Sequence, residues 1–302
     1  MSAIEIPPGP AGPPGPEPAS EPVLVLRAEG RHASRWYRQP ALVAGLAILT
    51  VVVGLALAAP LITSYSPIAQ NLNDSLLGPS SSHLLGTDQL GRDTFTRLLY
   101  GLRLDLRIAF IAVLLPFLLG IVLGSLAGYF GGWVDSVIMR LVDIVVAFPF
   151  YVLIIALVFV LGPGERSIYI AITLVGWVAY ARIIRGEILV AKRQDYITAA
   201  RSGGLSNVRI MRRHLLPNVI SQGFIYGMSD IVQDILAIVT LGYLGLGIPP
   251  PTADLGSMIN DGQNFLSTHW QLTTIPGLAV VVVGLGLSLV GDGLADLLRP
   301  GQ

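Results

Sequence analysis

Two acidic residues stand inside a long apolar run of this 302-residue chain. Asp230 and Asp234 are four positions apart within residues 219–247, so a helix there places both carboxylates on one face. Carboxylates in such a run are costly unless they meet a cation or line a polar path. Two alternatives remain open. The pair lines a translocation path and attracts a cation such as an ammonium group, or both carboxylates pair with arginines of a partner subunit.

A strongly basic segment precedes this run, and we call residues 190–218 the basic loop. The basic residues in this loop and just before it are Arg182, Arg185, Lys192, Arg193, Arg201, Arg209, Arg212 and Arg213. Only two acidic residues, Glu187 and Asp195, offset their charge.

The order of residue types in the basic loop predicts two short helices. The first covers residues 194–202 and ends at Gly203 and Gly204, which supply the backbone freedom that a helix end needs. The second runs from Val208 to about Leu216, and Pro217 closes it because proline has no backbone N–H.

The second helix is predicted to be amphipathic and basic. Ser206 or Asn207 is the candidate for its cap. Spacings of three and four place its arginines on one face, opposite Val208 and Met211. These arginines are Arg209, Arg212 and Arg213. Such a helix either docks onto a protein partner or rests on anionic lipid.

Catalytic and metal-binding side chains are scarce. There is no cysteine, and the four histidines have no metal-site spacing, so we expect neither a catalytic residue nor a bound metal. A nucleotide-binding Gly-x-x-x-x-Gly-Lys-Ser/Thr loop is excluded, because the single lysine, Lys192, is followed by Arg193. An intramembrane aspartyl protease is disfavoured, since Leu289 replaces the glycine that should precede Val290-Gly291-Asp292.

The elements that position these residues are membrane spans. The chain is 53% hydrophobic and 13% charged, whereas soluble domains carry about 25% charged residues. Six segments meet the requirement of roughly 20 apolar residues for a helix that crosses a bilayer. They are residues 41–62, 108–130, 144–161, 167–184, 219–247 and 272–290. We therefore predict an all-α polytopic membrane protein with six transmembrane helices.

Basic residues predict its orientation, because arginine and lysine flanking a span stay on the cytoplasmic side. Arg27, Arg31, Arg35 and Arg38 precede the first span, and the basic loop follows the fourth. With six spans these two regions fall on one side, so both termini are predicted to be cytoplasmic. Four arginines of the first external loop oppose this bias, partly offset by three aspartates.

Around these spans we expect two domains. Residues 1–39 are rich in proline and glycine and form a disordered cytoplasmic tail, or alternatively a proline-rich ligand for a partner. Residues 40–302 form the transmembrane domain, with external loops at 63–107 and 248–271. Within the second span Gly120, Gly124 and Gly128 allow a close helix contact, which either lines a path or is ordinary packing.

The basic loop resembles the signature loop of the permease subunits of ABC importers. That family has Glu-Ala-Ala, then glycine, then Leu-Pro thirteen residues after the glycine; here these are Ala199-Ala200, Gly204 and Leu216-Pro217, with Thr198 in place of the glutamate. In the family this loop forms a coupling helix that fits a groove on the ATPase subunit. The resemblance implies the same role here for Ala199, Ala200, Gly203, Gly204, Arg209, Arg212, Arg213, Leu216 and Pro217.

A second motif narrows the resemblance to the peptide and nickel permeases. After the first span stand Gly86, Thr87, Asp88, Gly91, Arg92 and Asp93, as in the member of that group with a Gly-Thr-Asp-x-x-Gly-Arg-Asp sequence. Residues 244–262 and 291–300 also resemble that group. From its residues alone, the motif either holds a tight turn through Asp88 and Asp93 or touches a substrate-delivery protein.

The resemblance implies a type I importer permease in the bacterial cytoplasmic membrane. Its partners would be a homologous second permease, two ATPase subunits or a fused pair, an extracytoplasmic solute-binding protein and membrane lipid, with no nucleic acid. ATP and Mg would be held by the ATPase subunits, and this chain would be non-catalytic with no cofactor. Alternating access would move a dipeptide or oligopeptide; a nickel or other chelate remains the alternative, and a secondary transporter a more distant one.

Overall fold

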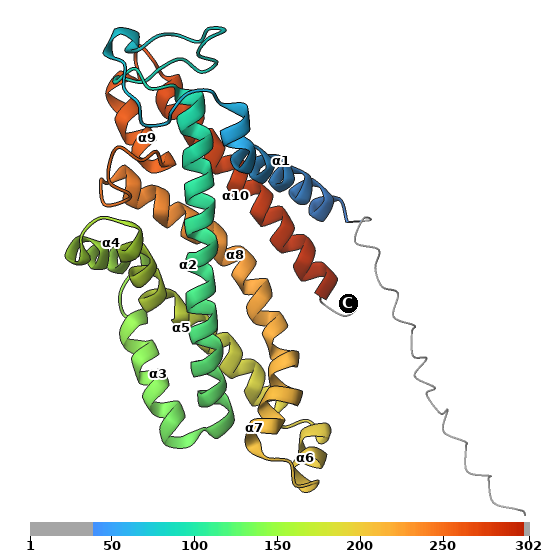
Figure 1. Ribbon diagram of the computed structural model, residues 1–302. Coiled ribbons are helices and arrows are strands. Elements are labelled where there is room, and N and C mark those ends of the chain that lie inside the picture. The colour runs from blue at the N-terminus through green and yellow to red at the C-terminus, as the bar shows by residue number, and fades with distance from the viewer. Residues whose placement is uncertain (1–38, 299–302) are drawn as a thin grey trace, which may run out of the picture. The chain divides into compact units, whose positions relative to one another are not determined.

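The computed structural model describes residues 39–298, and residues 1–38 of the predicted tail lie outside the described residues. Within them the regular structure is helical, with one isolated β-bridge and no strand. The helices are α1 (Pro40–Ile62), α2 (Thr94–Phe130), α3 (Gly132–Val146), α4 (Phe150–Leu161), α5 (Glu165–Ala191), α6 (Asp195–Ser202), α7 (Asn207–Ile210), α8 (Leu216–Tyr243), α9 (Leu255–Gly262) and α10 (Gln271–Leu298) (Figure 1). The all-α prediction is confirmed.

Five described helices are long and apolar enough to cross a membrane, and a bent pair brings the count to six. The bent pair is α3 and α4, whose axes differ by 88°. The composition of residues 144–161 suggested one straight span, but the structure breaks this segment. The break at residues 147–149 follows from Pro149, which has no N–H and disfavours the helical conformation at Phe148.

The most extensive helix contact joins α2 to α5. A Cβ atom at Gly124 would lie 2.6 Å from the carbonyl oxygen of Ala181, and one at Gly128 would lie 3.0 Å from Cβ of Ile188. Such distances leave no room for a side chain. The close helix approach expected from the three glycines is thus present in the structure.

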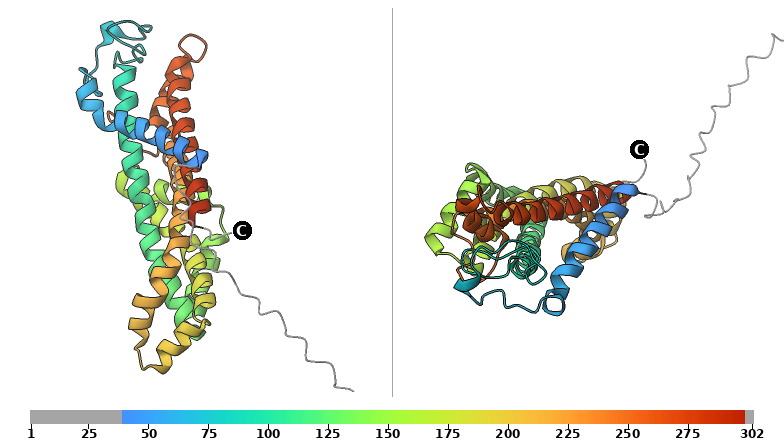
Figure 2. Two further views of the ribbon diagram at one scale, coloured as in Figure 1. Left: turned by 90° about the vertical axis from the view of Figure 1, so that its right-hand side faces the viewer. Right: turned by 90° about the horizontal axis from the view of Figure 1, so that it is seen from above.

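The remaining long helices pack around this pair. Helix α8 contacts α2, α5 and α10, while α1 packs against α10 and crosses it at an angle (Figure 2). Helix α2 begins at Thr94, inside the segment expected to be an external loop, so it extends well beyond its apolar run. The loop that precedes α2 and the pair α6–α7 lie at opposite ends of this helix (Figure 1).

Candidate functional site

The first helix of the basic loop ends where its glycines predicted. The N–H of Gly203 donates to the carbonyl of Ala199 at 2.9 Å, and the N–H of Gly204 to that of Arg201 at 3.1 Å. Gly204 has φ +76°, a left-handed conformation that side chains with a Cβ adopt only at a cost. Ala199 and Ala200 lie in the last turns of α6. The loop therefore reverses direction at these two glycines.

Pro217 does not end the second helix, contrary to the prediction. The chain stays helical from α7 through a π-helical turn, Met211–Leu215, into α8, and Pro217 lies in the first turn of α8. Proline is tolerated there because the N–H groups of a first turn have no intrahelical partner to lose. The π-helical turn just before Pro217 holds one residue more than an α-helical turn does.

The predicted division of faces was also partly wrong. Val208 is 64% exposed and lies beside the arginines, where Ser206, Val208, Arg209, Arg212 and Arg213 line one shallow cavity. Val208 lies four residues before Arg212, which puts its side chain on the basic face. The buried side chains are instead Ile210 and Leu215. The exposed face is nonetheless basic, as expected.

The apolar side of the basic loop is anchored on the long helices. Ile197, Ile210 and Leu215 are fully buried in one cluster with Ile188 of α5 and Tyr129 of α2. Burial of each such side chain contributes about 1.5–3 kcal/mol. The loop is therefore expected to move together with the ends of α2 and α5 rather than separately from them.

Two hydrogen bonds strengthen this anchor. Tyr129 Oη donates to Oδ1 of Asn207 at 2.7 Å, which joins the end of α2 to the first residue of α7. Lys192 Nζ donates to the carbonyl oxygen of Gly128 at 2.8 Å. Sequence reasoning missed Tyr129, because a tyrosine at the end of an apolar run is typical of any membrane span.

Asp230 and Asp234 are both buried in the interior of the chain, at 4% and 1% exposure. Oδ2 of Asp230 accepts a hydrogen bond of 2.7 Å from Oη of Tyr180 on α5. Neither oxygen of Asp234 has a hydrogen-bond partner among the described residues. A role of the two carboxylates in a translocation path stays a prediction, and the sequence had not indicated that Tyr180 would bond to Asp230.

Two ion pairs connect α5 to α3. Arg185 forms a two-pronged contact with Asp135, with Nε–Oδ1 at 2.5 Å and Nη2–Oδ2 at 2.6 Å. Asp143 of α3 contacts Arg182 at 3.5 Å, and both side chains are exposed there.

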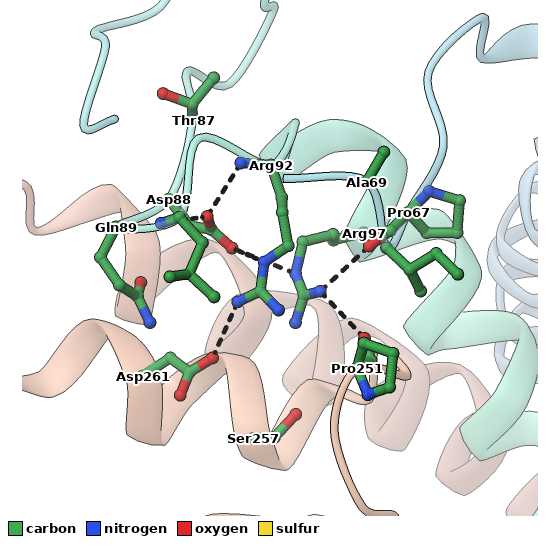
Figure 3. A network of polar contacts seen from close by, with 12 residues as sticks. Pro67, Ala69, Thr87, Asp88, Gln89, Arg92, Arg97, Pro251, Ser257 and Asp261 are labelled. Atoms are coloured by element: carbon green, nitrogen blue, oxygen red, sulfur yellow. Dashed lines mark hydrogen bonds and ion pairs between the residues drawn. The ribbon is translucent and has the colours of Figure 1, made fainter. Parts of the chain in front are cut away.

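A charge cluster lies at the other end of α2, and we call Asp88, Arg92, Arg97 and Asp261 the Asp88 cluster (Figure 3). All but Asp261 are buried. Oδ1 of Asp88 accepts the N–H groups of Leu90 and Arg92 at 2.9 and 3.0 Å, which holds the predicted tight turn. Its Oδ2 meets Nε of Arg92 at 2.6 Å and Nε of Arg97 at 3.4 Å.

The Asp88 cluster joins three parts of the chain. Arg97 on α2 donates to the carbonyl oxygens of Pro67 and Pro251, at 3.1 and 3.5 Å. Arg92 Nη2 lies 3.3 Å from Oδ2 of Asp261 on α9 (Figure 3). Asp93 caps α2 by accepting the N–H of Thr96 at 2.7 Å. The motif therefore organises both loops at this end, and any contact with a delivery protein stays a prediction.

We expect Asp88→Ala to destabilise the chain strongly. The change leaves Arg92 and Arg97 buried without their shared carboxylate, and loss of one partner of a buried ion pair costs about 3–5 kcal/mol. Thermal unfolding of the purified protein, followed by tryptophan fluorescence, measures the loss. Asp261→Ala is the matched control, because this aspartate is only partly buried and its removal should cost about 1 kcal/mol or less. Equal losses for the two variants would contradict the central role of Asp88.

Comparison with known proteins defines the class. Residues 120–302 match the family described as the binding-protein-dependent transport system inner membrane component. The chain belongs to this family, the ABC-importer permeases that its loop resembles, and it is a multi-pass protein of the bacterial inner membrane. Residues 31–79 match a second family, the N-terminal TM domain of oligopeptide transport permease C, which specifies the branch.

Curated relatives agree with this assignment over nearly their whole length. The dipeptide transport system permease protein DppC of Alkalihalophilus pseudofirmus is 38% identical over 85% of both chains. The di/tripeptide transport system permease protein DppC of Pseudomonas aeruginosa is 36% identical, over 94% of this chain and 96% of its own. The glutathione transport system permease protein GsiD of Pectobacterium atrosepticum is 37% identical over 88% and 89%.

A solved structure supports the fold. An inward-facing form of the MetNI methionine ABC transporter aligns with a TM-score of 0.52 at 17% identity. The alignment covers 67% of this chain and 97% of that one. The membrane fold is therefore shared with an importer permease, while the additional residues of this chain lie outside the shared part.

Proposed function

We propose that this chain is the transmembrane permease subunit of an ATP-driven importer that carries peptides across the bacterial cytoplasmic membrane. The observation that carries the proposal is the basic loop, whose arginine face is exposed while its apolar face is fixed to α2 and α5. The relatives include dipeptide and di/tripeptide permeases, which favours a peptide over a nickel chelate as the substrate.

The basic loop couples conformational changes of separate ATPase subunits to the transmembrane helices. Closure of two ATPase subunits around ATP and Mg pushes the loop, and the attached helices rock between inward-open and outward-open arrangements. A homologous second permease completes the path, and an extracytoplasmic binding protein delivers the peptide. The basic loop and both termini are cytoplasmic. ATP binding thereby drives the alternating-access change of the transmembrane helices.

Uptake into proteoliposomes tests the proposal. The complex of both permeases and the ATPase subunits is reconstituted with ATP inside and binding protein with labelled dialanine outside. We expect dialanine to accumulate only when the ATP, the binding protein and every subunit are present. Accumulation by this chain alone, or without ATP, would show instead a secondary transporter or a channel.

Tyr129→Phe is expected to loosen the coupling without unfolding the chain. The change removes one hydrogen bond to Asn207 worth about 1 kcal/mol and keeps the ring in its apolar cluster. We therefore expect the ATP hydrolysed per imported dialanine to rise by up to about 5-fold.

Tyr196→Phe provides the control for this measurement. Its hydroxyl makes only a long, exposed contact of 3.4 Å with Asn218. The ratio of ATP hydrolysed to dialanine imported should stay unchanged in this variant. If Tyr129→Phe also left the ratio unchanged, the hydrogen bond between α2 and α7 would have no part in coupling.

A further inference from the structure

A cavity beside Asp230 carries opposite charges in its lining. Its volume is about 470 Å³, within the range of about 300–1,000 Å³ usual for small-molecule sites. Asp230 of α8 and Arg182 of α5 both line it. Much of the remaining lining is apolar, with Phe148 from the α3–α4 break and Phe150 from the start of α4. A cavity of this size with one acidic and one basic group suits a small molecule that bears both charges.

The acidic part of the cavity is suited to a cation. Asp230 is held in place by the hydroxyl of Tyr180 at 2.7 Å, and Asp234 lies one helical turn away with neither oxygen bonded among the described residues. Because both carboxylates are withdrawn from water, a cation that enters the cavity next to them is favoured. Tyr226 also lines the cavity, and its aromatic ring is of the kind that attracts ammonium groups.

The basic part of the cavity is suited to a carboxylate. The side chain of Arg182 is 49% exposed, and its contact with Asp143 is long, at 3.5 Å, and exposed. Exposed pairs of this kind contribute little, so a ligand can compete for the guanidinium. A guanidinium has five N–H donors in a planar fork that matches a carboxylate.

We propose that this cavity binds a zwitterionic peptide during transport, with the terminal ammonium at Asp230 and the terminal carboxylate at Arg182. The inference rests on the proposed function and adds a specificity-determining site within this subunit. Asp234 acts through the negative charge it adds behind Asp230. The permease itself then selects peptides with two free ends, in addition to any selection by the binding protein.

The absence of native cysteine allows a direct test. Gln233 lines the cavity and is exposed, so Gln233→Cys gives this chain a single thiol at the site. The complete transporter carrying this change is placed in nanodiscs without binding protein or ATP. The rate at which N-ethylmaleimide modifies this chain is followed by mass spectrometry, with dialanine, N-acetyldialanine or dialanine amide present.

Dialanine is expected to protect the thiol. Removal of either terminal charge should raise the concentration for half-protection by about 10-fold or more, as expected for the loss of a charged hydrogen bond. Asp230→Asn should weaken protection by dialanine to the level of the acetylated peptide, and Arg182→Gln to that of the amide. Asp292→Asn, the same change on α10 outside the cavity, should leave protection unchanged.

Two results would overturn the inference: absence of protection by dialanine, or equal protection by all three peptides. The comparison of the three peptides needs neither charge variant, so it stands even if Asp230→Asn fails to assemble. Ala179→Cys, which also lines the cavity, serves as a second reporter. Failure of the proposed function is a separate result, because it appears as absent ATP-dependent uptake by the unchanged transporter.

Discussion

Gly204→Pro is expected to lower ATP-dependent peptide uptake by more than about 10-fold while the chain remains in the membrane. Gly204 has φ +76°, whereas proline requires a φ near −65°. Proline would also remove the N–H that donates to Arg201. The turn between α6 and α7 would open, and the arginine face would lose its position. Uptake of labelled dialanine and ATP hydrolysis stimulated by binding protein are the two measurements.

The neighbouring glycine provides the control. Gly203 has φ −73°, and a Cβ atom there would lie 3.3 Å from the nearest carbonyl oxygen, so alanine needs only a small adjustment. Gly203→Ala should therefore retain uptake and stimulated hydrolysis. Normal uptake in Gly204→Pro would remove the basic loop from the coupling mechanism.

Gly124→Leu is expected to prevent stable folding. The new Cβ would stand 2.6 Å from the carbonyl oxygen of Ala181 and 3.0 Å from its Cα, which are backbone atoms that cannot rotate away. Overpacking of this kind costs about 3 kcal/mol, and here it separates α2 from α5. We expect the amount of protein extracted from membranes to fall severely and the melting temperature of any remainder to drop.

Gly54→Leu is the matched control, because a Cβ at Gly54 of α1 meets nothing within 4 Å. Leucine at this position should leave the yield and the melting temperature unchanged or slightly raised, since it is also a better helix former. Equal stability of the two variants would show that α2 and α5 do not need their close approach.

Structural features that depend on local chemistry could be predicted from the sequence. Apolar length alone predicted the long helices, and the left-handed preference of glycine placed the end of α6. The aspartates of the external motif hold their turn as their spacing indicated. In each case the cause lies within a few residues of its effect.

Features that depend on distant contacts were not accessible. Pro217 suggested a helix end, but the π turn before it lets α7 continue into α8. Asp143 pairs with Arg182 because the packing of α3 against α5 brings them together. The hydrogen bonds of Tyr129 with Asn207 and of Tyr180 with Asp230 join residues at least 50 positions apart. Spacing along the chain carries no signal for such pairs.

Cross-linking from the basic loop tests most directly whether an ATPase acts through it. Val208→Cys places a single thiol on the exposed basic face, and Leu84→Cys places one, equally exposed, in the loop before α2. We predict that a thiol-to-amine cross-linker joins Val208→Cys to an ATPase subunit, with a yield that changes when ATP is added, and that Leu84→Cys gives no such product. An ATPase adduct from Leu84→Cys but not from Val208→Cys would contradict the proposed coupling and the proposed orientation together.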